Sequence, residues 1–179
     1  MTELSKNDIL NYFEEINRRL AKKNKTGEIV IAGGAALTVV FNARDATHDI
    51  DAIFAPPGDM REIIKSMAED YNLHDDWFND GVKGFVTDKM NFTPILSYSN
   101  LSVSNVDARG LLAMKLTSAR DNTKDMDDSI FLMKHLEIRS EKELFEIIEK
   151  YTHPKQQSVR SRFFTQEAYF RYQRDIVAK

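Results

Sequence analysis

The chain has 179 residues, 42% of them hydrophobic and 30% charged, which are ordinary fractions for a globular protein with a core of normal size. It contains no cysteine, which excludes disulfide frameworks, zinc sites with thiolate ligands and thiol nucleophiles. A net charge of −3, a polar N-terminus and the lack of an apolar run of roughly 20 residues predict a cytoplasmic protein that does not enter a membrane.

The first predicted element is a helix, followed by a strand. Ser5 and Asp8 have the spacing of a capping arrangement, and the helix ends at a basic cluster before Gly27. The apolar residues of this helix recur at helical spacing and are Ile9, Phe13, Ile16 and Leu20. Residues 28–32 form a short β-branched run, which predicts a buried strand.

A glycine pair interrupts this first strand. Gly33 and Gly34 end it, and residues 35–41 predict a short helix packed on the sheet. A second strand is predicted over residues 48–54, where two prolines stop it. Asp59 then offers an N-cap for the next helix.

The remaining chain changes from strand-forming to helical patterns. Residues 77–81 predict a loop, and residues 92–96 and 101–104 predict two more strands. From Asp107 to the end the pattern is helical, with a capping box at residues 140–143. A helix, a sheet-forming half and a helical half in this order predict an α+β fold.

The C-terminal end of the chain is basic. Residues 150–179 contain seven Lys or Arg and two Asp or Glu, a balance of +5, so the rest of the chain carries −8 within the net charge of −3. A basic end on an acidic body is typical of a surface for an anionic partner such as RNA. It is equally typical of a solvated helix face.

The stretch that indicates chemistry runs from the glycine pair to Asp49-Ile50-Asp51. Side chains alternate along a strand, so Asp49 and Asp51 are expected on one face. Two such carboxylates suit Mg²⁺, which prefers oxygen ligands and shares them with substrate phosphates, and Mn²⁺ is the alternative ion. Gly33 and Gly34 let backbone N–H groups approach a phosphate. Together these residues predict a site for a metal ion and a nucleoside triphosphate.

Each part of this pattern also has a simpler interpretation. Two aspartates on a strand are commonly an exposed acidic face, and a glycine pair is commonly a turn. The combination in a strand, Gly-Gly, helix and strand order is much rarer and favours the nucleotide site. A dinucleotide-binding loop fits less well, because residues 33–36 are not Gly-x-Gly-x-x-Gly, and a Walker loop is excluded because no Gly-Lys-Ser/Thr occurs.

The same residues carry a family resemblance. Gly33-Gly34 followed by Asp49-Ile50-Asp51 resembles the signature of the nucleotidyltransferase superfamily that includes DNA polymerase β. Other stretches are similar to a bacterial family related to the AbiEii-type abortive-infection toxins, and they are residues 77–80, residues 111–116, Ala119-Arg120, Lys124-Asp125 and Asp128. The likeness extends from about Gly27 to Tyr151.

The resemblance implies a nucleotidyltransferase fold, with a small mixed sheet flanked by helices. On this basis we expect an α/β core over residues 1–106 and a helical region over residues 107–179, within one continuous domain. It also implies nucleotide transfer, in some relatives to tRNA ends, and pairing of a toxin with an antitoxin protein. Active superfamily members place a third carboxylate on a later strand, whereas residues 92–96 and 101–104 contain no acid and are only flanked by Asp88 and Asp107.

A second charged cluster lies in the helical half. Lys115 and Arg120 are candidates for binding the triphosphate, Lys as a point charge and Arg as a bidentate fork. Asp125 and Asp128 share a helix face and are expected to orient one of these cations or to favour a helix N-terminus. The four histidines show no metal-ligand spacing, so structural or surface roles are expected for them.

Two functional hypotheses follow. The first is an Mg²⁺-dependent enzyme that transfers a nucleoside monophosphate from a triphosphate to a hydroxyl acceptor, with RNA as the leading acceptor and a small molecule as another. The second is a catalytically silent module of the same fold that binds a nucleotide or a protein partner.

Overall fold

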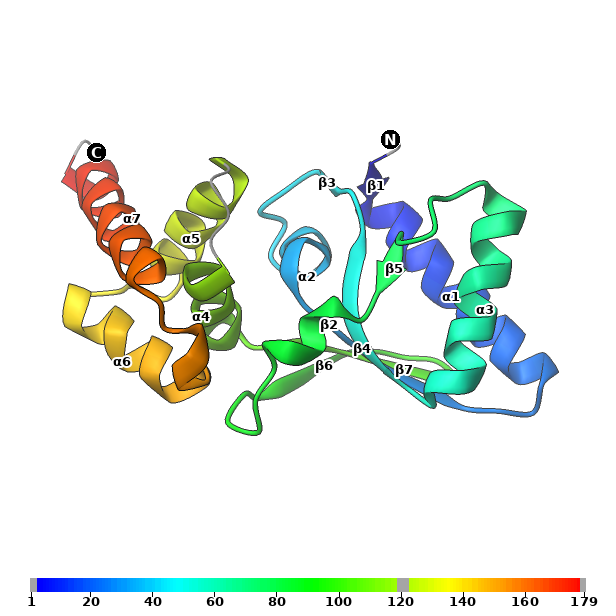
Figure 1. Ribbon diagram of the computed structural model, residues 1–179. Coiled ribbons are helices and arrows are strands. Elements are labelled where there is room, and N and C mark those ends of the chain that lie inside the picture. Colours follow the sequence, from blue (N-terminus) through cyan, green and yellow to red (C-terminus); the bar gives the residue numbers. More distant parts are fainter. Residues whose placement is uncertain (1–2, 119–122, 178–179) are drawn as a thin grey trace. The chain divides into compact units, whose positions relative to one another are not determined.

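The computed structural model describes residues 3–118 and 123–177 (Figure 1). The chain divides into two compact units, each described here by itself. The first unit comprises residues 1–84 and 92–106, and the second comprises residues 85–91 and 107–179. Among the helices of the described residues, none combines the length and the apolar character that a bilayer crossing requires.

The described part of the first unit is built on a five-stranded mixed sheet with strand order β5-β4-β2-β7-β6. Its strands are β2 (Gly27–Ile31), β4 (Ile50–Ala55), β5 (Phe78–Asn79), β6 (Phe92–Ser97) and β7 (Leu101–Val106). The β2 strand runs antiparallel to β4 and parallel to β7, while β5 runs parallel to β4. The shorter strands β1 (Leu4–Ser5) and β3 (Ala46–Thr47) form a separate antiparallel pair.

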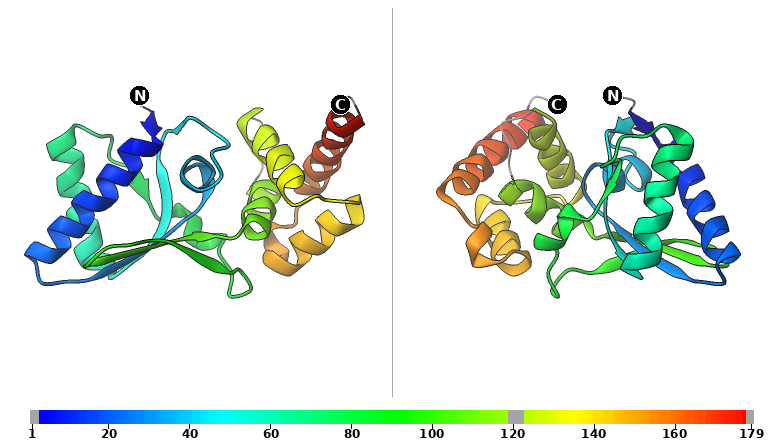
Figure 2. Two further views of the ribbon diagram at one scale, coloured as in Figure 1. Left: turned by 180° about the vertical axis from the view of Figure 1, so that it is seen from behind. Right: turned by 45° about the vertical axis from the view of Figure 1, so that its right-hand side comes forward.

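Helices cover one face of this sheet. The views in Figures 1 and 2 show α1 (Lys6–Lys22) and α3 (Pro57–Tyr71) side by side on that face, and α1 contacts β7 while α3 contacts β4. Ile29, Ile31 and Ala52 are fully or almost fully buried, whereas Asp51 and Ile53, which alternate with the buried residues of β4, are only half-buried. Alternation along the strands therefore separates an apolar core face from a face that carries Asp51.

The second unit is helical. Its helices are α4 (Ala108–Ser118), α5 (Thr123–His135), α6 (Glu141–Tyr151) and α7 (Val159–Val177), with the short 3₁₀ segment η2 (Pro154–Gln156) before α7. Leu112, Leu132 and Leu144 are fully buried between these helices. Residues 85–91 belong to this unit, and the Thr87 hydroxyl fastens them by donating to the Tyr151 carbonyl at 3.1 Å.

The α+β class and the main elements predicted from the sequence are confirmed. The Ser5 hydroxyl accepts from the Asp8 backbone N–H, and the Asp8 carboxylate accepts from the Ser5 backbone N–H, which completes the predicted capping box. The Ser5 hydroxyl also donates to the Asp8 carboxylate at 2.6 Å. This hydrogen bond, together with the one from the Ser5 backbone N–H, holds the pKa of the Asp8 carboxyl below its ordinary value.

Four local predictions were wrong. The short helix expected over residues 35–41 is α2 (Gly33–Val39), so the glycine pair opens this helix rather than preceding it. Asp59 is not an N-cap, because it lies in the first turn of α3, which already begins at Pro57. Proline fits the first position of a helix because its missing N–H would have no partner there. The second strand begins at Ile50 rather than at residue 48. Residues 77–81 are not simply a loop, because they contain β5 and the first residue of the 3₁₀ segment η1 (Gly81–Gly84).

Candidate active site

The glycine pair and the aspartate pair meet at one end of the sheet. Because β2 and β4 are antiparallel, the end of β2 lies beside the beginning of β4. Ile31 is paired with Ala52, and the Ala32 N–H donates to the Asp51 carbonyl at 2.9 Å. The antiparallel pairing thus brings the residues that follow β2 next to the residues that open β4.

Gly33 is in direct contact with the Asp51 carboxylate. A Cβ atom at Gly33 would lie 2.6 Å from Asp51 Oδ2, and Gly33 has a φ of +54°, in the left-handed region that L side chains rarely adopt. Glycine is therefore required at this position both by backbone conformation and by space. The glycine bend, Gly33-Gly34 at the start of α2, is thus next to Asp51 in the structure, as predicted.

Asp49 is positioned differently from the strand geometry that the sequence suggested. It lies one residue before β4, so regular alternation along a strand does not fix its side chain. Instead Asn79, the residue of β5 paired with Asp51, donates from its side-chain amide to Asp49 Oδ2 at 3.1 Å. The two carboxylates are half-buried, and the short parallel strand β5 helps to orient them.

A buried tryptophan supports this end of the sheet. The Trp77 carbonyl accepts from the Ile50 N–H at 2.8 Å, and the indole N–H donates to the Ile64 carbonyl at 3.2 Å. The ring is fully buried, with Tyr12 and Phe78 packed edge-on against it. From the sequence, Trp77 and Asn79 are expected to brace a loop near the site, and in the structure Trp77 holds the start of β4.

His74 is a further support of this end of the sheet, which agrees with the structural or surface role expected for the histidines. Its Nε2 lies 2.9 Å from the carbonyl oxygen of His48, the residue before Asp49, and its Nδ1 lies 2.5 Å from Asp76 Oδ1. The pKa of His74 is raised, first by the hydrogen bond to Asp76 and then by the His48 carbonyl. The spacing of His74 and Asp76 in the sequence does not by itself indicate this support. The carbonyl that His74 contacts lies 26 residues away in the chain.

The described residues contain no group of three or more His, Cys, Asp or Glu side chains arranged to hold a metal ion. Asp107 follows β7 and caps α4, since its Oδ1 accepts from the Gly110 N–H at 2.7 Å. Asp88 is exposed and, like Asp107, belongs to the second unit. On β5, the side chain in register with Asp51 is the amide of Asn79.

The second charged cluster is an ion-pair network inside the helical unit. Lys115 Nζ lies 2.7 Å from Asp125 Oδ1 and 2.9 Å from Asp128 Oδ2. These side chains are 14%, 11% and 4% exposed, respectively. Of the alternatives expected for Asp125 and Asp128, the structure shows their pairing with Lys115, and Asp125 also lies in the first turn of α5. Phosphate binding by Lys115 stays a prediction. Arg120 lies outside the described residues.

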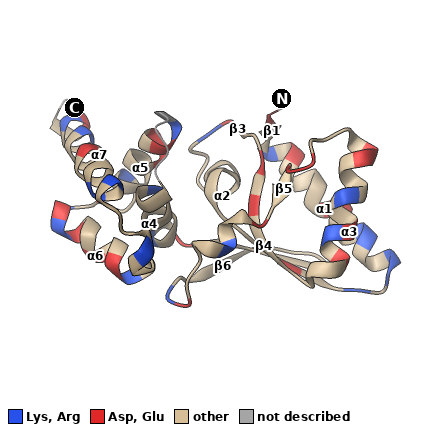
Figure 3. Cartoon of the chain, in the orientation of Figure 1, with Lys and Arg blue, Asp and Glu red and all other residues tan. Residues whose placement is uncertain are grey.

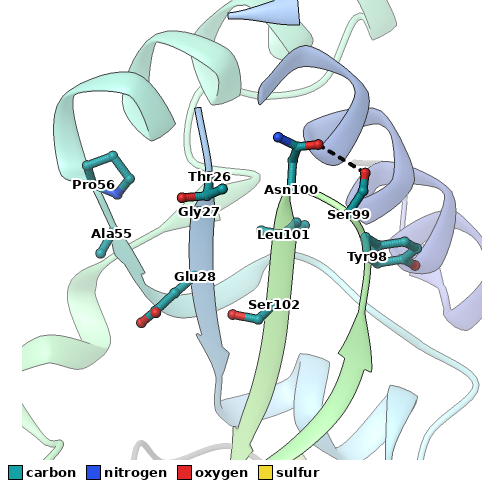
Figure 4. Close-up of a pocket in the computed structure, with 10 residues that line it drawn as sticks. All are labelled: Thr26, Gly27, Glu28, Ala55, Pro56, Tyr98, Ser99, Asn100, Leu101 and Ser102. Carbon is teal, nitrogen blue, oxygen red and sulfur yellow. Dashed lines mark hydrogen bonds between the residues drawn. The ribbon is translucent and has the colours of Figure 1, made fainter. Parts of the chain in front are cut away.

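A separate groove of about 500 Å³ lies in the first unit, lined by residues that include Gly27, Ala55 and Asn100 (Figure 4). Gly27 opens β2 and Ala55 closes β4. The groove is therefore at the opposite end of these strands from Gly33 and Asp51 and is not part of the acidic site.

A mixed sheet flanked by helices, with Gly33 packed against Asp51 and a second aspartate two residues before it, is consistent with the nucleotidyltransferase fold class. The family model described as “Nucleotidyltransferase of unknown function (DUF6036)” matches residues 7–176, and the chain belongs to this family. No curated protein and no solved structure matches the chain.

Proposed function

We propose that the chain is an Mg²⁺-dependent nucleotidyltransferase that moves a nucleoside monophosphate from a triphosphate to a hydroxyl acceptor. The observation that carries this proposal is the contact between Gly33 and the Asp51 carboxylate. Asp49, two residues before Asp51, accepts a hydrogen bond from Asn79, the residue in register with Asp51. Membership of a nucleotidyltransferase family supports the reaction type.

The donor set suits a hard divalent ion. Asp49 and Asp51 offer carboxylate oxygens on half-buried side chains, and such oxygens are the ligands that Mg²⁺ or Mn²⁺ prefers when it is shared with phosphates. In the proposed site these two aspartates hold the ion. Bound there, Mg²⁺ would supply neutralisation of phosphate charge and polarisation of the reacting oxygens.

The protein's own contribution is positioning. The Gly33-Gly34 bend has no side chains, so its backbone can approach a phosphate while Asp51 stays within contact distance. Asn79 orients Asp49 toward the same end of β4, and Trp77 fixes the start of that strand. Lys115 and Arg120 belong to the second unit, and for them triphosphate binding stays an expectation from the sequence.

The test is replacement of one metal-binding carboxylate. In Asp51→Asn, transfer of α-labelled nucleotide to an acceptor should fall by at least about 100-fold, because several kcal/mol of charge stabilisation are lost. Asp75→Asn is the matched control, since Asp75 is an exposed aspartate of the same unit. Retained transfer in Asp51→Asn would defeat the metal assignment.

We propose an RNA as the acceptor. The support is the basic C-terminal region, in which Arg160, Arg162 and Arg174 are exposed along α7 (Figure 3). Labelled transfer to an RNA pool, compared with transfer to small hydroxyl compounds, distinguishes this acceptor from a small-molecule one. An AbiEii-like toxin role with an antitoxin partner rests on the sequence resemblance and predicts that expression arrests growth only while Asp51 is intact.

A catalytically silent module is the second candidate. It is favoured by the amide of Asn79 in register with Asp51 and by the lack of a three-acid cluster among the described residues. Calorimetry with each triphosphate and Mg²⁺, combined with a pyrophosphate-release assay over a panel of acceptors, separates the two. Binding without release would support the silent module.

A further inference from the structure

Arg44 lies at the same glycine bend as Asp51. A Cβ atom built on Gly34 would lie 3.2 Å from Arg44 Nη1, and one built on Gly33 would lie 2.6 Å from Asp51 Oδ2. Consecutive Cα atoms are about 3.8 Å apart. A guanidinium and a carboxylate thus contact adjacent residues of one bend.

The loop that carries Arg44 is fixed on both sides. On the N-terminal side, the Ala43 N–H donates to the Leu37 carbonyl at 2.9 Å, and Lys6 Nζ donates to Asn42 Oδ1 at 2.9 Å. On the C-terminal side, Thr47 pairs with Leu4 in the β1–β3 ladder. Arg44 is half-buried between these attachments. Hydrogen bonds on both sides therefore hold the backbone that carries the Arg44 guanidinium.

The chemistry of these neighbours suits a phosphate chain. An arginine guanidinium binds phosphate oxygens through paired N–H donors, and its charge is permanent at physiological pH. The carboxylate on the other side of the bend suits a metal ion that is itself bound to phosphate. A nucleoside triphosphate carries enough phosphate oxygens to meet both groups, whereas a monophosphate has a single phosphate group.

We propose that Arg44 is a binding residue for the phosphate tail of a nucleoside triphosphate and gives the site its preference for triphosphates over monophosphates. This inference rests on the proposed function, because it places the tail at the same bend as Asp51. The ligand class is a Mg²⁺-bound triphosphate, and recognition is through the phosphates rather than the base.

The experiment measures binding by calorimetry with the full chain and Mg²⁺. The probes are a non-hydrolysable analogue of each of the four nucleoside triphosphates and the matching monophosphates. Arg44→Gln should weaken triphosphate binding by about 10- to 100-fold, as expected for loss of a charge-assisted hydrogen bond. Monophosphate binding should change by less than about threefold, and Arg44→Lys should fall between wild type and Arg44→Gln.

Arg18→Gln is the matched control, because Arg18 is an exposed arginine of the same unit that pairs with Glu15. Thermal unfolding of each variant shows whether it is folded, and Arg44→Lys keeps the charge if Arg44→Gln is unstable. Unchanged triphosphate affinity in folded Arg44→Gln, or equal losses for both ligands, would overturn the role of Arg44 alone. Wild-type protein that binds no triphosphate would overturn the proposed function together with this inference.

Discussion

The two units each contain a charged cluster, and the clusters are built on opposite principles. In the first unit, two half-buried aspartates of like charge, Asp49 and Asp51, lie two residues apart at the start of β4. In the second unit, the half-buried Lys115 pairs with two buried aspartates, Asp125 and Asp128. Like charges held together at a protein surface favour a cation from outside, whereas a compensated buried pair mainly holds helices together. The comparison separates a cluster whose negative charges are left for a cation to neutralise from one whose charges are already compensated within the chain.

The largest expected effect is on the network of the second unit. Lys115→Ala should lower the free energy of unfolding by about 3–5 kcal/mol, because it leaves Asp125 and Asp128 buried without their ammonium partner. Urea denaturation followed by far-UV circular dichroism measures the loss. Lys142→Ala, which removes an exposed pair with Glu146, should change stability by less than about 1 kcal/mol. A small effect of Lys115→Ala would mean that this cluster is not structural.

The next effect concerns the bend of the first unit. Gly33→Ala should destabilise the first unit by about 1–3 kcal/mol, because a side chain is strained at a φ of +54° and would collide with Asp51 Oδ2. Trp77 is the single tryptophan and lies in the first unit, so its fluorescence follows unfolding of that unit. Gly58→Ala is the control, since a Cβ atom there meets nothing within 4 Å. Equal stability of the two variants would contradict the strain assignment.

Helix caps allow the two units to be weakened by similar amounts. Ser5→Ala removes the cap of α1 in the first unit, and Ser140→Ala removes the cap of α6 in the second. Each should cost about 1 kcal/mol. If the units unfold separately, tryptophan fluorescence should report the Ser5→Ala change and be insensitive to Ser140→Ala. Identical shifts in fluorescence for both variants would show that the units unfold together.

The smallest expected effect is a pH dependence confined to the first unit. The pKa of His74 is raised from its ordinary 6.5 by Asp76 and the His48 carbonyl. The protonated His74 therefore contributes its full share to the free energy of unfolding below pH 6.5, and this share is lost as the pH rises through the raised pKa of His74. Tryptophan-monitored unfolding should show this loss in the wild type and not in His74→Gln. A wild-type profile that is flat over this window would remove His74 as a support of the site.

The sequence by itself determined the features that depend on neighbouring residues. Three of these features are local patterns: the Ser5 capping box, the buried run before the glycine pair and the proline-terminated second strand. A fourth is the order of strand, Gly-Gly, helix and strand, which brings Gly33 near Asp51 through a short connection. These features form because backbone conformation and side-chain alternation are set within a few residues.

The tertiary structure alone decided which distant side chains complete the site. Asn79 reaches Asp49 across 30 residues, His74 reaches the His48 carbonyl across 26, and Lys115 of α4 meets Asp125 of α5. Arg44 lies near Asp51 in the sequence, yet its place at Gly34 depends on the β1–β3 pairing of the loop. Such contacts are set by strand register and packing between elements, which no local pattern in one sequence encodes.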